Sequence, residues 1–268
     1  MRLKGQRVVL TGASGGIGQA MARQLLSKGS QILLIGRNQK ALSALESELQ
    51  QLGRDTNQKV LSLAIDVTNN DERERLVEYA NNTMGGVDIL INLAGAMSFS
   101  NFSEESPEVT EQLFQTNALA PMQLSRLLIP QMKKQKYGEI VNIGSIFGSI
   151  AFAWFTTYSS TKFALRGFSE SLRRELIGTG IGVTYIAPRA VQTPFNSDRI
   201  MAMCKATGTN IDQPEAVAEQ IINTLEHGKK ERYLGFPEKL FVRINSLFPR
   251  LVDHALNKQN QTAKDYLN

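Results

Sequence analysis

Short apolar runs alternate with longer amphipathic stretches along most of this chain. Six runs of four or five residues lie at 7–10, 31–35, 60–64, 88–91, 139–143 and 183–186. Between them, apolar residues recur at helical spacing over 17–28, 39–52, 70–84, 107–134 and 157–178. The alternation predicts βαβ units that build a parallel sheet. Because such crossovers are right-handed, we expect helices on both faces of the sheet, in a doubly wound α/β domain.

Residues 194–212 depart from this pattern. The segment is polar and contains Gly and Asn, with Ile200, Met201 and Met203 as an apolar set. Long loops in compact domains often carry function, so we predict a lid over the carboxyl edge of the sheet. An ordinary surface loop with a helical turn is the alternative.

The last segment, residues 237–268, is predicted to extend a domain that occupies residues 1–236. Apolar residues recur there at helical spacing, with Lys239, Arg243 and Arg250 between them; they are Leu240, Phe241, Ile244, Leu247, Phe248 and Leu251. We predict an amphipathic basic helix that Pro249 interrupts, followed by a polar end that frays from residue 257. Docking onto its own domain is favoured over a partner subunit, a cap on a binding site or an anionic membrane surface.

Composition and charge exclude several classes of protein. The 268 residues carry a net charge of +5 in scattered positions, which favours anionic ligands over nucleic acid. The single cysteine, Cys204, excludes an intrachain disulfide, and no metal site is predicted; His227 and His254 are expected on the surface. The N-terminus has no room for a signal peptide, and no apolar run approaches the ~20 residues of a membrane span, so we predict a cytoplasmic protein.

A glycine-rich turn, residues 11–18, follows the first predicted strand and opens the first helix. Gly12 permits a tight turn, Gly16 lets a pyrophosphate approach the backbone, and Gly18 lets the helix pack on the strand. The free N–H groups of the helix start then face the phosphates. This context predicts a dinucleotide site, and the missing Lys-Ser/Thr ending disfavours a nucleoside triphosphate.

The end of the second strand indicates which dinucleotide binds. An acidic residue there would bind the ribose 2′-hydroxyl of NAD. This chain has Gly36 and Arg37 instead. A guanidinium group suits a 2′-phosphate, so we predict NADP(H) and consider NAD less suited. The alternative for Arg37 is a solvated turn residue.

Tyr158 and Lys162 lie four residues apart on a predicted helix, with Ser145 upstream. Residues at this spacing share one helix face. A fixed ammonium group favours the phenolate, so we expect Lys162 to lower the pKa of Tyr158. The pair then predicts a proton donor and acceptor, although a solvated helix face is the alternative for the pair alone.

Together these motifs resemble the classical short-chain dehydrogenase/reductase family, from about residue 4 to residue 195. Asp66 and Val67 are similar to its adenine-contacting pair, residues 92–95 to its Asn-Asn-Ala-Gly, and residues 188–193 to its Pro-Gly-x-Val-x-Thr. Arg189 replaces the glycine of that last segment, which alters the local backbone or places a cation near the substrate. The resemblance implies cofactor contacts at Gly12, Ser14, Gly15, Gly16, Ile17, Gly18, Arg37, Asp66, Val67, Asn92, Ala94, Gly95, Tyr158, Lys162, Pro188, Val191 and Thr193.

The resemblance also implies a Rossmann-like, seven-stranded parallel sheet and hydride transfer between a nicotinamide and a carbonyl or alcohol. Ser145 would bond the substrate oxygen, and Tyr158 would deliver the proton. Lys162 would hold the nicotinamide ribose, and Asn117 would anchor a water that links Lys162 to solvent. Members of the family commonly form dimers or tetramers, so a homodimer or homotetramer is expected.

An aromatic run precedes Tyr158 where the family places its substrate: Phe147, Phe152, Trp154 and Phe155. With Met97, Phe99, Met201 and Met203 it suits a small apolar carbonyl or alcohol, unless it only packs the core or a subunit contact. One alternative function is a 3-oxoacyl thioester reductase, whose acidic carrier protein would need a basic patch such as Arg189, Arg199 and Lys205. Another, from a different class, is an NADP-binding sensor without turnover.

Overall fold

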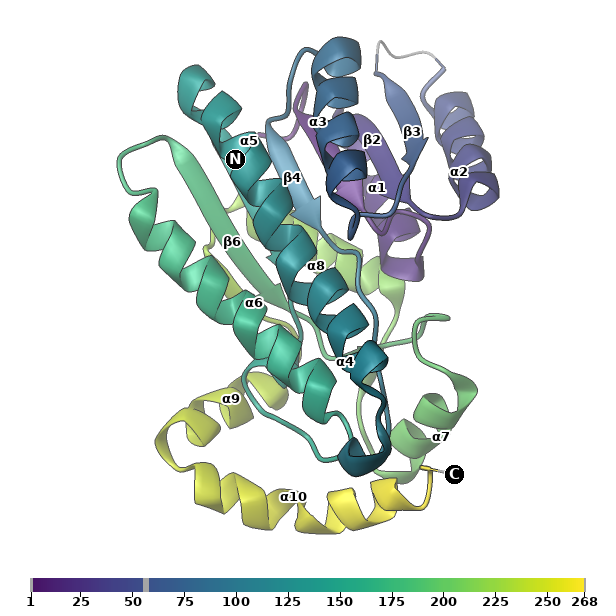
Figure 1. Cartoon of the computed structure of the whole chain (residues 1–268), viewed down its shortest axis with the longest axis vertical. Coiled ribbons are helices and arrows are strands. Elements are labelled where there is room, and N and C mark those ends of the chain that lie inside the picture. Colours follow the sequence, from purple (N-terminus) through teal and green to yellow (C-terminus); the bar gives the residue numbers. More distant parts are fainter. Residues whose placement is uncertain (1, 55–57, 268) are drawn as a thin grey trace.

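The computed structural model describes residues 2–54 and 58–267, so Met1 and Asn268, the outer ends of the two predicted units, lie outside it. Its main sheet has the order β3-β2-β1-β4-β5-β6-β9, with every pair parallel (Figure 1). The strands are β1 (Arg7–Thr11), β2 (Gln31–Gly36), β3 (Val60–Ala64), β4 (Ile89–Asn92), β5 (Gly138–Ile143), β6 (Ile181–Ala187) and β9 (Glu231–Tyr233). The prediction of a Rossmann-like, seven-stranded parallel sheet in one domain is confirmed.

The central strands are buried on both faces, because successive side chains point into two different cores. In β1, Val8 and Leu10 pack in one core and Val9 packs in the other, and all three are fully buried. The first core is covered by α1 (Gly16–Ser27), α2 (Gln39–Leu52) and α8 (Pro214–Glu226). The second is covered by α3 (Asn70–Met84), α5 (Ala120–Gln135) and α6 (Thr156–Glu175).

Local capping explains why several helices begin and end where the sequence predicts. The side chain of Asn38 accepts a hydrogen bond from the Ala41 N–H at 3.0 Å and starts α2. Asn69 caps α3 in the same way. Gly85 ends α3 with φ at 74°, a conformation that glycine adopts without strain.

The stretch 107–134, predicted as a long helical stretch, is helical throughout but not uniform. It consists of α4 (Pro107–Phe114), a π-helical turn (Gln115–Leu119) and α5. A π-helical turn widens the helix locally and is frequent at functional sites. Asn117 lies in this turn and is fully buried. The predicted long helical stretch is therefore confirmed, and the π-helical turn within it is a feature that the pattern did not indicate.

The C-terminal part of the chain covers the carboxyl edge of the sheet, where the strands end (Figure 1). The segment 194–212, predicted as a lid with a surface loop and helical turn as the alternative, contains α7 (Asp198–Ala206). It ends in β8 (Ile211–Asp212), which pairs with β7 (Ala190–Val191) in a small second sheet. Helices α9 (Glu238–Leu247) and α10 (Pro249–Lys264) cross below this edge. The predicted interruption at Pro249 is confirmed.

The expected fraying from residue 257 is wrong, because α10 continues to Lys264. Ala263 is buried, and Tyr266 and Leu267 pack against the same apolar cluster as Tyr158. Burial of these side chains offsets the entropy cost of ordering the chain end. None of the described helices combines the length and apolar character needed to cross a membrane.

Candidate active site

A cavity of about 650 Å³ lies at the carboxyl edge of the sheet and extends from the glycine-rich turn to α10. It opens where the strand order reverses between β1 and β4, the place where doubly wound sheets bind ligands. Most of the predicted site residues line it: Gly12, Ser14, Gly15, Gly16, Ile17, Gly18, Arg37, Asp66, Val67, Ala94, Gly95, Ser145, Phe147, Phe152, Phe155, Tyr158, Lys162, Pro188, Arg189, Val191 and Thr193.

Close contacts within the protein hold the glycine-rich turn in the shape that a dinucleotide site needs, because side chains cannot replace its glycines. A Cβ at Gly12 would lie 2.8 Å from the Ala94 nitrogen, and one at Gly18 would lie 2.3 Å from the Gly12 oxygen. A Cβ at Gly16 would meet the Thr193 methyl group at 2.6 Å, so this glycine lets the segment after β6 close over the turn. Within the described chain, no side chain caps the start of α1, which leaves its first N–H groups to a phosphate.

The other end of this groove carries opposite charges. Arg37 follows β2, is exposed, and lines the cavity beside Asp66. Burial opposes ionisation of Asp66, but hydrogen bonds from the Thr68 N–H and hydroxyl, helped by the charges of Arg37 and Arg73, lower its pKa. Asp66 is thus fixed as a carboxylate, whereas Arg37 reaches the cavity from the open rim.

Ser145, Tyr158 and Lys162 meet where the wall of the cavity is most buried. Ser145 ends the loop after β5, while the other two lie in the first turns of α6. The ammonium nitrogen of Lys162 lies 5.6 Å from the centre of the Tyr158 ring and donates to the Ile143 carbonyl at 3.3 Å. The Ser145 hydroxyl accepts from the Phe147 N–H at 3.1 Å, and its interaction with the Tyr158 hydroxyl acts to lower the pKa of Tyr158. The structure therefore brings these three predicted residues together.

The expected lowering of the Tyr158 pKa is wrong for this structure, in which the pKa is raised. Burial raises the pKa of Tyr158 to about 12, and the hydrogen bond with Ser145 only partly opposes it. Burial also lowers the pKa of Lys162 to about 8. Lys162 has thus lost its charge before the phenol titrates, and it cannot favour the phenolate through charge at that pH.

Two predicted asparagines stand behind the cavity rather than on its wall. The side-chain oxygen of Asn117 accepts from the Ala96 N–H, and its side-chain NH₂ group donates to the Ala96 carbonyl, both at 2.8 Å. The same NH₂ group also donates to the Thr161 hydroxyl at 3.0 Å. Asn92 donates to Asn142 at 2.8 Å between β4 and β5. These contacts connect the strand ends to α6, next to Lys162. Asn142 is a support that the motifs did not reveal.

The aromatic wall has the predicted composition with one exception. Phe147, Phe152 and Phe155 line the cavity, and the Phe147 ring is stacked on Phe152 at 4.5 Å between centres. Trp154 does not line it, contrary to prediction. Its backbone has φ at 70°, and its indole N–H donates to the Asn260 carbonyl of α10 at 3.0 Å. Trp154 thus connects the aromatic run to the C-terminal helix.

The apolar residues expected to face the same cavity also divide into two groups. Met97 and Met203 line the cavity. Phe99 is buried beside it, stacked on Phe155, and Met201 does not line it.

Arg189 lines the cavity with its charge fully engaged. Its guanidinium group bonds both oxygens of Asp212, at 2.9 and 2.8 Å, and both oxygens of Glu238, at 3.2 and 3.0 Å. Its φ lies outside the left-handed region, so its backbone does not need the glycine of the family pattern. Of the two expected effects of this arginine, a backbone change and a cation facing the substrate, the structure supports neither. Arg189 instead joins β8 to the start of α9.

The floor of the site is formed by α9 and α10, where the sequence allowed a cap on a binding site only as an alternative and did not predict the residues that line it. The lining residues there are Phe241, Val252, Ala255, Leu256, Gln259, Asn260 and Ala263. Val252, Leu256 and Ala263 share one face of α10, and their i, i+4, i+11 spacing is the signal that could have indicated it. The polarity of the residues between them concealed that face.

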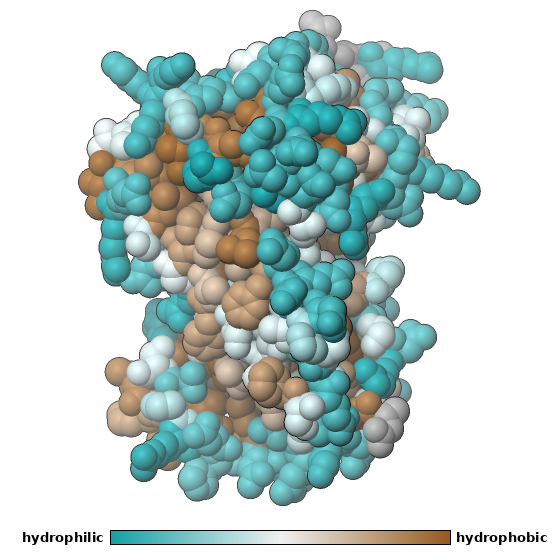
Figure 2. Space-filling view, viewed as in Figure 1, coloured by the Kyte–Doolittle hydropathy of each residue, from teal (hydrophilic) through white to brown (hydrophobic). Residues whose placement is uncertain are grey.

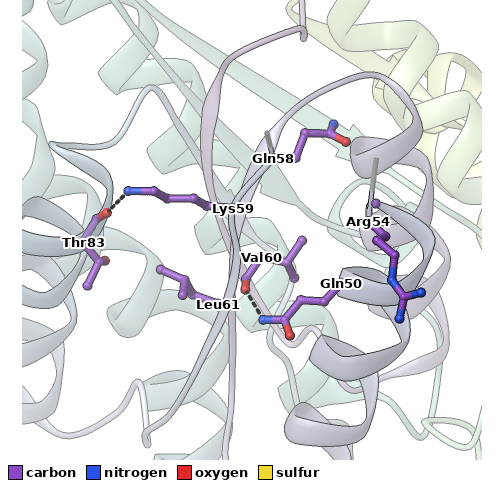
Figure 3. Close-up of a pocket in the computed structure, with 8 residues that line it drawn as sticks. Gln50, Arg54, Gln58, Lys59, Val60, Leu61 and Thr83 are labelled. Carbon is purple, nitrogen blue, oxygen red and sulfur yellow. Dashed lines mark hydrogen bonds between the residues drawn. The ribbon is translucent and has the colours of Figure 1, made fainter. Parts of the chain in front are cut away.

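A second hollow, of about 520 Å³, lies at the amino end of β3 and beside α2, away from the predicted site. In it, Lys59 donates to the Thr83 carbonyl at 3.1 Å and Gln50 donates to the Val60 carbonyl at 2.9 Å (Figure 3). None of the predicted site residues lines it. The predicted site residues therefore point to the cavity at the carboxyl edge of the sheet and not to this hollow.

Comparison with known proteins gives the family. A family model described as short chain dehydrogenase matches residues 6–202. The chain belongs to this family. Relatives include the ketoacyl reductase HetN of Nostoc, 33% identical over 94% of this chain and 88% of its own length. The 3-ketodihydrosphingosine reductase of Mus musculus is 31% identical over 88% of this chain and 73% of that protein.

Among solved structures, L-sorbose reductase from Gluconobacter frateurii, complexed with NADPH and L-sorbose, is similar to this chain with a TM-score of 0.77. The two are 26% identical, and the likeness covers 87% of this chain and 96% of that one. As a member of the short-chain dehydrogenase family, this chain is an oxidoreductase that acts on CH–OH or C=O groups with a nicotinamide dinucleotide. Family membership thus favours an enzyme over the sensor alternative.

Proposed function

We propose that this enzyme reduces the carbonyl group of an apolar substrate with NADPH, using Tyr158 as the proton donor. One observation carries the proposal: a single cavity joins the glycine-rich turn, the Ser145–Tyr158–Lys162 group and an aromatic wall. A dinucleotide in the turn would extend toward Tyr158, and the aromatic side would remain for the second reactant. The nicotinamide supplies the hydride when it is bound.

NADP is the proposed cofactor because Arg37, a cation at the rim of the cavity, follows β2 and no acidic residue stands next to it in sequence at that strand end. Arg37 takes part in no ion pair among the described residues. It lies just before α2, whose N-terminal dipole also favours negative charge. A ribose 2′-phosphate would receive both interactions. The NADPH bound to the sorbose reductase agrees with this proposal.

The proposed proton transfer follows from the charges at the site. With a pKa of about 12, Tyr158 keeps its proton at neutral pH and serves as the acid for a developing alkoxide. Ser145 donates a second hydrogen bond to that oxygen and stabilises its charge. Lys162, with a pKa of about 8, is mostly charged at pH 7 and holds the nicotinamide ribose. Asn117 fixes the Ala96 backbone and Thr161, and so positions the helix that carries both residues.

An apolar substrate is proposed because of the side chains that remain beside Tyr158. Phe147 and Phe155 present rings, and Met203 and Leu256 complete an apolar surface on the opposite side. The two relatives named above act, according to their names, on ketoacyl groups and on 3-ketodihydrosphingosine, and both names agree with reduction of a keto group. The same lining would suit L-sorbose poorly, because the sugar's hydroxyl groups would lose their water partners.

A 3-oxoacyl thioester remains the second candidate, favoured by the ketoacyl reductase relative. Delivery by an acidic carrier protein has less support, because two of the three expected basic residues are engaged. Arg189 is bound by Asp212 and Glu238, and Arg199 donates to the carbonyls of Leu267 and Phe99. Arg199 and Lys205 are both exposed, and of the three only the Lys205 side chain is without such a contact among the described residues. A thioester of a small carrier such as coenzyme A is therefore the form to test.

The proposal is tested by NADPH oxidation with a panel of 3-oxoacyl thioesters of increasing chain length, ketosteroids, aromatic aldehydes and L-sorbose. We expect turnover of apolar carbonyl compounds, with kcat/KM rising as the apolar part lengthens and little turnover of the sugar. Preferred turnover of L-sorbose would overturn the substrate assignment. Tight NADPH binding with no turnover of any compound would favour the sensor.

Subunit assembly is proposed to use the outer faces of α5 and α6, as expected from the family. Leu119 and Phe163 are exposed there, and Figure 2 shows apolar side chains along this side of the molecule. Sedimentation of Phe163→Glu against the unaltered chain tests the proposed homodimer or homotetramer, because an unchanged mass would contradict it. The cytoplasmic location stays a prediction.

A further inference from the structure

The turn between α9 and α10 exposes a dense group of large apolar side chains. Six of the twelve large apolar residues that are exposed in the described chain lie within residues 236–251: Phe236, Leu240, Phe241, Leu247, Phe248 and Leu251. We call these six the apolar corner. The turn projects from the lower side of the molecule in Figure 1, and Figure 2 shows apolar side chains exposed there. Single exposed apolar residues are ordinary, but a group of this size marks an interaction surface.

Basic side chains surround the apolar corner. Lys239, Arg243 and Arg250 are exposed, and none of them takes part in an ion pair among residues 2–54 and 58–267. The acidic residue nearest in sequence, Glu238, is turned toward Arg189 at 3.0 Å, a cation that it shares with Asp212. Asp253 is the one exposed acidic residue in the first two turns of α10. The corner therefore combines apolar surface with net positive charge.

The apolar corner is continuous with the active-site cavity. Phe241 belongs to both, since it is partly exposed and also lines the cavity. On the inner side of the same two helices, Val252 and Leu256 line the cavity as well. An apolar route thus leads from the outer surface of α9 toward the aromatic wall. A surface built only for a water-soluble partner would not need this continuity.

We propose that the apolar corner docks on the surface of an anionic lipid bilayer. Leu247, Phe248 and Leu251 would enter the boundary between headgroups and acyl chains, while Arg243 and Arg250 meet lipid phosphates. A projecting turn with apolar and basic side chains suits a deformable anionic lipid surface. Substrate would then enter the cavity beside Phe241 from the bilayer. This last step rests on the proposed function, whereas docking does not.

The test measures flotation of the full chain with lipid vesicles, without any substrate. One set contains phosphatidylcholine alone, and the other contains equal parts of phosphatidylcholine and phosphatidylglycerol. We expect at least tenfold more protein with the anionic vesicles, and a loss of binding at high salt. Leu247→Glu combined with Leu251→Glu should lower the bound fraction at least tenfold. Arg243→Gln combined with Arg250→Gln should lower it several-fold and reduce its dependence on salt.

Matched controls keep the test independent of folding. Leu247 and Leu251 are 72% and 63% exposed, whereas Leu52 and Ile177 are 67% and 79% exposed on other parts of the surface. Leu52→Glu combined with Ile177→Glu should leave vesicle binding within twofold of the unaltered chain. NADPH binding of each variant, measured by fluorescence, reports whether the fold is intact.

Three outcomes would overturn the proposal. The unaltered chain would fail to float with anionic vesicles, or the control pair would lose as much binding as the corner pair. In the third, the unaltered chain would not bind vesicles, and the corner pair would lower the sedimenting mass measured without vesicles. The apolar corner would then be a contact between two copies of the chain. Because none of these measurements uses turnover, a wrong substrate assignment would leave them unaffected.

Discussion

The two sides of the active-site cavity are held by different kinds of contact. On the cofactor side, backbone meets backbone: a Cβ at Gly18 would lie 2.3 Å from the Gly12 oxygen. On the C-terminal side, side chains make the contacts, as when the Trp154 indole N–H donates to the Asn260 carbonyl. A contact between backbones at a glycine leaves no room for a larger residue, whereas a contact made by side chains tolerates many different side chains. The cofactor side is therefore fixed for one ligand, and the C-terminal side can vary with the substrate.

The largest effect is expected at the point where the two sides meet. Tyr158→Phe removes the proposed proton donor and should lower kcat for NADPH-dependent reduction about 10³-fold. The aromatic ring remains, so the NADPH dissociation constant should change less than about threefold. Steady-state kinetics and a fluorescence titration of NADPH measure the two effects. Tyr79→Phe, on α3 and outside the lining of the cavity, is the control, and normal turnover by the Tyr158 variant would exclude the mechanism.

Lys162 should show that a functional residue on the cofactor side lowers the free energy of unfolding of the protein. Its pKa falls from 10.5 to about 8 in the folded protein, so between these pH values the unfolded chain binds more protons and stability rises with pH. Below pH 8 the full cost is present, and Lys162→Met should raise the free energy of unfolding at pH 7 by about 3 kcal/mol. The gain should shrink above pH 8 and vanish near pH 10.5.

Denaturant unfolding of the cofactor-free protein across this pH range measures the gain. Lys133→Met, at an exposed position on α5, should change stability by less than about 0.5 kcal/mol at every pH. A gain in the Lys162 variant that does not depend on pH would mean that better packing, not charge burial, is responsible.

The same contrast explains how much the sequence could predict. The glycine turn, Asp66 and the Ser145–Tyr158–Lys162 group follow from local spacing, because each lies at the end of a strand or on one helix face. The floor of the cavity could not be read in this way. Asn260 and Ala263 contribute only after α10 has docked on residues far away in the chain, and polar neighbours conceal their face.

Other differences have physical causes of the same kind. The pattern missed β7, β8 and β9, because two or three residues are too few to show a period. The π-helical turn at Asn117 is set by contacts with Ala96 and Thr161, which no local spacing reveals. The pKa direction of Tyr158 was wrong because spacing shows proximity to Lys162 but not burial.

Arg37 tests the cofactor side at its open rim. Arg37→Ala should weaken NADPH binding about 30-fold, or about 2 kcal/mol, because a charge-assisted bond to the 2′-phosphate is lost. NADH binding should change less than about twofold. Arg75→Ala on α3 is the matched control. Equal losses for both dinucleotides in a calorimetric titration would contradict the NADP assignment.

Ala255 tests the C-terminal side at the cavity mouth. It is exposed and lines the cavity, so Ala255→Trp should fill the mouth without straining the core. We expect kcat/KM for the longest apolar substrate to fall about tenfold, with short substrates and NADPH binding little affected. His254→Trp, one residue away and outside the lining, should have no such effect. A loss independent of substrate length would contradict a role of this mouth in substrate choice.

The smallest effect is expected at Arg189, which joins the C-terminal side together. Lysine keeps the charge but cannot bond Asp212 and Glu238 at four oxygens, so Arg189→Lys should lower the free energy of unfolding by about 1 kcal/mol. Hydrogen exchange should rise in α9, whose first residue is Glu238, and remain unchanged in α1. Arg23→Lys affects an ion pair with Glu48 that is exposed, and should cost less than about 0.5 kcal/mol. If exchange rose equally in α1 and α9, Arg189 would support the whole domain rather than the docking of its C-terminal helices.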